Sequence, residues 1–133
     1  MYIVADNMKR LEYIAEMQIS AYTSDDIEYL NSLFEDDREL LAEGAALTLY
    51  ASCKNIIAKI ANEYHKRCMR EPYLQEIPRE VRLAFYSFTR KNLPELLKEY
   101  NTKYGDLDVY ISKNVCLLYE RVIKRYLGID FYK

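Results

Sequence analysis

One segment of the sequence, residues 36–70, constrains the fold more than any other. Apolar side chains recur there at the spacing of one helix face, and no proline interrupts them. This stripe consists of Leu40, Leu47, Tyr50, Cys53, Ile57, Ile60, Tyr64 and Cys68. A helix of about 30 residues is about 45 Å long, more than the diameter of a domain of this size. We therefore predict one long central helix, which can bend or restart only at Gly44.

Two shorter helices are expected before the long one. Residues 6–20 form the first, with an apolar face that includes Leu11 and Ile14. Thr23 begins the second, and Asp26 stands three residues later, as in a capping box. Ile27, Leu30 and Phe34 form the apolar face of this second helix.

Prolines and glycines mark the helices that follow the long one. Pro78 and Pro94 each fit the first position of a new helix, where the missing amide donor is not needed. The last helix starts at Asp106 or Asp108 and ends at Gly128, a residue suited to a left-handed cap. The fold is therefore expected to be all-α, with five to six helices in an elongated bundle around one long central helix and no sheet.

Turn-forming residues are scarce in this chain. Its 133 residues include 3 glycines, 3 prolines and no tryptophan. β-Barrels and sandwiches need a turn about every 8–12 residues, so the composition excludes them. Three scattered glycines cannot build a glycine-rich phosphate loop either. We predict a single helical domain over residues 1–127, followed by a tail at 128–133 that could be a truncated linker to a missing domain.

No apolar run approaches the about 20 residues that a membrane helix needs. The N-terminal residues also lack the basic region and apolar stretch of a signal peptide. We therefore expect a cytoplasmic protein with no membrane partner.

The side chains that most often carry chemistry are few. His65 is the only histidine, and Cys68 follows it on the same helix face. A zinc site needs two more ligands, for which only Cys53, Cys116 and carboxylates remain. Cys68 also lies on the apolar stripe, where a thiol is an inert core side chain. We predict no catalytic residue, no cofactor, no metal and no small-molecule substrate, and hence no enzyme.

Charge is unevenly distributed along the sequence. Residues 1–44 hold 3 basic and 11 acidic side chains, whereas residues 45–133 hold 16 basic and 10 acidic ones. The candidate basic patch consists of Lys59, Lys66, Arg67, Arg70, Arg79 and Arg82. These charges can be solvated helix faces, or they can dock to a complementary subunit or to phosphate.

Tyrosine is unusually frequent, with 14 copies. Tyrosine is enriched at protein interfaces because it combines a large contact area with a polar tip. The tyrosines placed near loops or polar faces are Tyr73, Tyr86, Tyr104 and Tyr110, which we take as interface candidates. The alternative is that a chain without tryptophan uses tyrosine as its bulky core residue.

Three stretches together carry a family resemblance. They are LYASCKNIIAKIANEYHKRCMRE, LQEIPREVRLAFYSF and VCLLYERVIKRYLGIDFYK. Together they resemble the helical domain of an archaeal-type subunit of the GINS complex, the replication factor that joins the MCM helicase. The last stretch looks like the passage into the family's small β-domain, which this chain lacks after Lys133. The resemblance implies a non-enzymatic role in a tetramer packed through long helices.

We therefore expect a non-enzymatic helical scaffold or interaction subunit. It is expected to form homo- or hetero-oligomers with protein subunits. Its most specific form is a GINS-like component of the DNA replication helicase assembly. The first alternative is a small nucleic-acid-associated subunit, such as a CRISPR-related or viral protein, in which the basic patch contacts phosphates. We expect such nucleic-acid binding to be weak. A second alternative is a ferritin-like or thiol enzyme.

Overall fold

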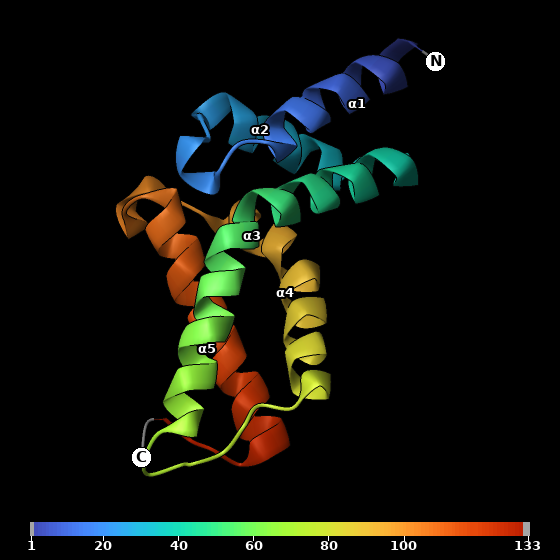
Figure 1. Cartoon of the computed structure of the whole chain (residues 1–133). Coiled ribbons are helices and arrows are strands. Elements are labelled where there is room, and N and C mark those ends of the chain that lie inside the picture. The colour runs from blue at the N-terminus through green and yellow to red at the C-terminus, as the bar shows by residue number, and fades with distance from the viewer. Residues whose placement is uncertain (1, 132–133) are drawn as a thin grey trace.

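The long helix expected from the sequence is present as α3 (Glu39–Met69), a helix of 31 residues. The structure, a computed structural model, describes residues 2–131, with side chains from residue 6 onward. Figure 1 shows that α3 changes direction along its course, so that its first part lies beside α1 and its second part beside α5. The helix is nevertheless continuous through Gly44. α3 is thus the element to which the other helices attach.

Four further helices and two 3₁₀ turns surround α3. In chain order they are α1 (Tyr2–Ala15), η1 (Ile19–Ala21), α2 (Ser24–Phe34), α4 (Arg79–Glu99), η2 (Thr102–Tyr104) and α5 (Leu107–Leu127). α1 and α2 pack on α3 and form one end of the molecule, while α4 and α5 pack on α3 and on each other (Figure 1). The described residues form no strand. The prediction of an all-α fold around one long helix is therefore confirmed.

The buried face of α3 agrees with the predicted stripe only in its second part. That face consists of Leu41, Ala45, Thr48, Leu49, Ser52, Cys53, Ile57, Ile60, Ala61, Tyr64 and Cys68. Leu40 and Leu47, which we expected in the core, are 61% and 44% exposed. The reason is that α1 and α2 cover the start of α3 from a side rotated by about one residue from the predicted stripe.

A buried hydroxyl joins the end of α1 to the middle of α3. Ser52 lies in the core and donates a hydrogen bond of 3.0 Å to the carbonyl oxygen of Ile14. The hydroxyl of Tyr22 donates in turn to Ser52 at 2.8 Å. The hydroxyls of Ser52 and Tyr22 therefore each have a partner, which removes the penalty for placing a serine in the core.

Gly44 allows α1 to approach α3 closely. A Cβ atom at this position would lie 3.3 Å from Cδ1 of Leu11. We expected Gly44 to be a weak point where the long helix bends or restarts. The structure shows instead a glycine inside an unbroken helix, at the crossing with a neighbouring helix.

The first helix ends earlier than the predicted boundary at residue 20. α1 covers Tyr2–Ala15, and the chain then turns so that Ile19 is buried in η1. The face that buries Leu11 and Ile14 would continue with Gln18, which is polar. Because the helix ends before Gln18, the chain can instead bury Ile19.

Pro94 does not start a new helix, as we had predicted, but lies inside α4. α4 buries Val81, Phe85, Thr89, Leu93 and Leu97, each four residues after the previous one. An interior proline costs a helix about 3 kcal/mol. Burying the leucines before and after it contributes about 1.5–3 kcal/mol each, which is enough to keep the helix continuous.

Pro94→Ala is expected to raise the free energy of unfolding by about 1–2 kcal/mol. The alanine restores an amide donor for the carbonyl of Arg90 and removes the ring clash, while the more flexible unfolded chain offsets part of this gain. Urea denaturation followed by circular dichroism measures it. The control Glu95→Ala, at an exposed neighbour, is expected to change the value by less than about 0.5 kcal/mol. A destabilised P94A variant would contradict this account of α4.

Candidate interaction surface

The inner face of α5 fixes the orientation of the whole helix. Ile111, Val115, Tyr119 and Ile123 on this face are fully buried. The ring of Tyr119 stacks on Phe85 of α4, with centroids 3.9 Å apart. The helix ends as predicted at Gly128, which has a φ of 72° and donates its N–H to Lys124. With the inner face fixed, the opposite face of α5 is held toward solvent.

The outer face of α5 carries a ridge in which a lysine lies between two exposed apolar side chains. Val109, Lys113 and Leu117 follow one another at four-residue spacing, and the valine and the leucine are 57% and 36% exposed. Surface hollows lie beside this ridge, and each of them includes at least one ridge residue. We call the ridge and its hollows the α5 face.

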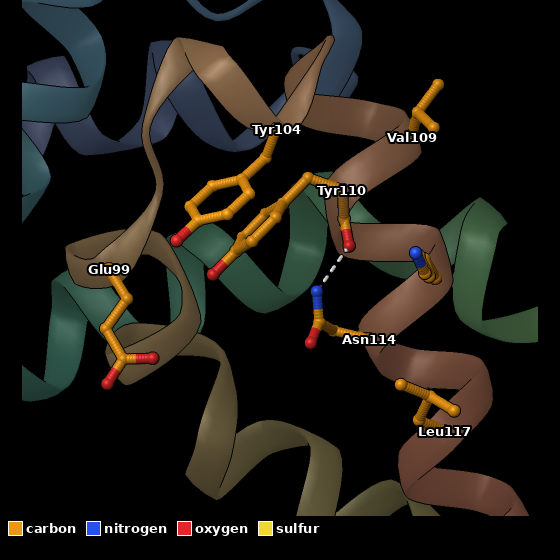
Figure 2. Close-up of a pocket in the computed structure, with 7 residues that line it drawn as sticks. Glu99, Tyr104, Val109, Tyr110, Asn114 and Leu117 are labelled. Atoms are coloured by element: carbon orange, nitrogen blue, oxygen red, sulfur yellow. Dashed lines mark hydrogen bonds between the residues drawn. The ribbon is translucent and has the colours of Figure 1, made fainter.

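The first hollow lies between α5 and the end of α4 (Figure 2). The rings of Tyr104 and Tyr110 stack in it with centroids 5.5 Å apart, and Figure 2 shows their hydroxyls on the side of Glu99. The hydroxyl of Tyr110 donates to the carbonyl of Leu96 at 2.9 Å. Burial, and then the charge of Glu99, raises the pKa of Tyr110. Asn114 donates to the backbone oxygen of Tyr110 at 2.8 Å, which holds the hollow's floor in place.

The second hollow lies between α5 and α3. It is lined by Ile56, Lys59, Ile60, Glu63, Asp108, Val109, Ser112, Lys113 and Cys116. Its lining thus combines apolar side chains with charges of both signs. Lys59 is the one residue of the predicted basic patch that belongs to the α5 face.

The third hollow lies where the C-terminal residues return to the bundle. Phe131 lines it and packs edge-on against Tyr64 and Tyr73, with centroid distances of 5.3 Å to each. The hydroxyl of Tyr64 donates to the carboxylate of Glu120, another lining residue. Within the tail predicted at 128–133, the described residues therefore pack on the helices; residues 132 and 133 lie outside the described part.

The other residues of the basic patch lie at the end of the bundle where α3 stops and α4 begins. Arg67 of this group lies over the ring of Phe131, with its guanidinium carbon 4.4 Å from the centroid. Arg70 donates to the backbone oxygen of Lys66 at 3.3 Å. Arg79 and Arg82 follow on the first turn of α4, across the connecting loop. Lys66 and Arg67 also stand in the last turn of α3, where cations stabilise a helix terminus.

The four candidate tyrosines do not form one surface. Tyr104 and Tyr110 lie together in the first hollow. Tyr73 packs on Phe131 at the other end of α5, and Tyr86 packs on Phe85 within α4. Val109 and Leu117 were not among the predicted interface residues. The helical periodicity places both of them on the face of the last helix opposite its buried stripe.

The thiols in this structure are poor nucleophiles. Burial raises the pKa of Cys53 to about 12, and burial also raises the pKa values of Cys68 and Cys116. Among the described residues, no group of three or more His, Cys, Asp or Glu side chains is placed to hold a metal ion. No helix in this part of the chain combines the length and apolarity that crossing a membrane requires.

Comparison of the chain with family models, with curated proteins and with solved structures finds no match. The α5 face is therefore interpreted from its own geometry.

Tyr64→Phe is expected to make stability less sensitive to alkaline pH. Burial, and then the hydrogen bond to Glu120, raises the pKa of Tyr64 above its ordinary value of 10. Between that value and the higher folded pKa, the unfolded chain releases this proton first. The contribution of Tyr64 to the free energy of unfolding is therefore fully present below pH 10. Above pH 10 it falls by about 1.4 kcal/mol per pH unit.

Urea denaturation at pH values from 9 to about 11 measures this slope. In the Tyr64→Phe variant, this slope is expected to be smaller by the contribution of one titrating group. The control Tyr13→Phe, at a tyrosine 70% exposed, should keep the slope of the unchanged protein. Equal slopes in the Tyr64 variant and the unchanged protein would contradict the assignment.

Proposed function

We propose that this protein is a non-enzymatic helical interaction subunit that binds a helix of a protein partner along the α5 face. The observation that carries the proposal is the exposed ridge of Val109, Lys113 and Leu117, with hollows beside it. Side chains at four-residue spacing form the ridges that fit between the ridges of a neighbouring helix. A helix is therefore the occupant that this shape fits best.

The composition of the α5 face also favours a protein partner. Tyr104 and Tyr110 provide rigid aromatic area beside the ridge, and such side chains often carry much of the binding energy. Charged groups of both signs, including Glu63, Asp108 and Lys113, line the second hollow together with apolar side chains. Protein interfaces usually combine apolar and polar groups in this way.

The specific form of the proposal is a GINS-like component of a DNA replication helicase assembly. It rests on the resemblance of the three sequence stretches, together with the all-α bundle around one long helix. In that role, the chain's contribution is to hold partners and not to make or break bonds. The raised pKa values of the thiols support this, because the thiols stay protonated at neutral pH.

The double variant Val109→Asp, Leu117→Asp is expected to lose its protein partner while keeping its fold. Tagged protein is recovered from cells of the source organism, and the bound proteins are identified. The matched control is Tyr13→Asp with Tyr126→Asp, which places two carboxylates at exposed apolar residues outside the α5 face. Circular dichroism checks the fold of both variants.

A protein that is retained by the unchanged chain and by the control, but reduced at least about tenfold with the ridge variant, supports the proposal. Equal recovery with both variants contradicts docking on the α5 face. A replication protein among the specific partners would support the GINS-like form, and its absence would leave only the general function.

Binding to nucleic acid is the alternative that the basic end of the bundle suggests. We predict weak or no binding of duplex DNA at physiological salt. Lys66 and Arg67 already have structural roles, since both stabilise the C-terminus of α3 and Arg67 also lies over the ring of Phe131. Titration of labelled duplex at several salt concentrations measures the affinity. A steep salt dependence of several log units per log of salt, abolished by Lys66→Glu with Arg67→Glu, would favour phosphate contacts instead.

A further inference from the structure

A second exposed surface runs along α3 and α4, on helix faces that the α5 face does not use. α3 and α4 pack against each other (Figure 1), and a groove between them is lined by Glu43, Ala46, Ser87, Arg90, Lys91 and Pro94. None of these residues lines the hollows of the α5 face. We call this surface the α3–α4 groove.

Exposed leucines flank the α3–α4 groove. Leu40 and Leu47 lie on α3 on either side of Glu43 in sequence, and Leu83 lies on α4 one turn before Ser87. Each of the three is more than two-fifths exposed. The sequence pattern of α3 predicted that Leu40 and Leu47 are buried, yet both are left exposed to solvent by the described residues. An amphipathic helix whose apolar positions stay uncovered points to a partner that covers them.

The two walls of the groove carry opposite charges. α3 contributes Glu43 and, one turn earlier, Glu39, while α4 contributes Arg90 and Lys91. All four side chains are exposed. A surface with its acidic residues along one side and its basic residues along the other complements a copy of itself rotated by 180° about the groove.

We propose that two copies of this chain form a symmetric dimer through the α3–α4 groove, with the two-fold axis along it. This axis places α3 of one copy over α4 of the other, at the same height along the groove. Glu43 of each copy then faces Arg90 and Lys91 of the other, and the exposed leucines of both copies enclose the charge pairs. Closed two-fold dimers are the commonest oligomers of soluble proteins.

The dimer uses surfaces other than the α5 face, so the two proposals can fail separately. It leaves the ridge of Val109 and Leu117 open in both copies. A dimer of this kind therefore presents two docking faces for partner helices.

Charge reversal tests the dimer through its symmetry. In a dimer of the Glu43→Arg variant, the new arginine of each copy faces Arg90 and Lys91 of the other, so both contacts become repulsive. In a dimer of the Arg90→Glu, Lys91→Glu variant, the two new carboxylates of each copy face Glu43 of the other, and both contacts are again repulsive. Each variant alone should bind itself at least about tenfold more weakly than the unchanged chain. An equimolar mixture of the two should restore the dimer, because both of its contacts then pair opposite charges.

Sedimentation velocity over a concentration series measures the mass, which is 15.9 kDa for one chain. The unchanged protein is expected at twice this mass, and Glu12→Arg, an exposed reversal on α1, should match it. Circular dichroism confirms that the variants fold. A second variant, Leu40→Asp with Leu47→Asp, should also be monomeric.

Several outcomes overturn the proposal. They are a monomer at every concentration, dimers that survive both charge reversals, or a mixture that stays monomeric. A dimer broken by Val109→Asp with Leu117→Asp, but not by Glu43→Arg, would place the self-contact on the α5 face instead.

Discussion

The arrangement of this molecule depends on the burial of one face of α3. That face runs from Leu41 to Cys68, and each of the other four helices packs against a part of it. Because the first part is covered from one side and the second part from another, α3 changes direction along its course (Figure 1). The first part of α3 contributes to the α3–α4 groove, and its second part contributes to the α5 face.

Local sequence signals predicted the helix ends that are determined by contacts between residues close in sequence. Thr23 and Asp26 form the expected capping box, and Gly128 adopts the expected left-handed conformation. Pro94 was assigned wrongly because a proline's local preference for a helix start is outweighed here by the burial of Leu93 and Leu97. That burial depends on contacts distant in sequence, which a periodicity cannot show.

Two of the four candidate tyrosines lie on the α5 face. Tyr104 and Tyr110 lie together in a hollow, but Tyr73 packs on Phe131 from the C-terminal tail, a contact that no local pattern encodes. Val109 and Leu117 were not predicted, because the periodicity of the last helix marks the face that is buried and carries no signal for a partner on the opposite face. Leu40 and Leu47 show that the helical pattern can also mark side chains that are not buried. They lie on the predicted apolar stripe, yet the described residues leave both of them exposed.

The length of α3 also has a consequence for how the molecule unfolds. The same helix supplies the core beneath α1 and α2 and the core beneath α4 and α5. Neither half can melt without exposing part of a helix on which the other half rests, so the two halves should lose structure in a single cooperative transition. Cys53 lies fully buried on this shared helix. Its thiol should thus become accessible to alkylating reagents only when the whole chain opens, so its labelling rate would report global unfolding.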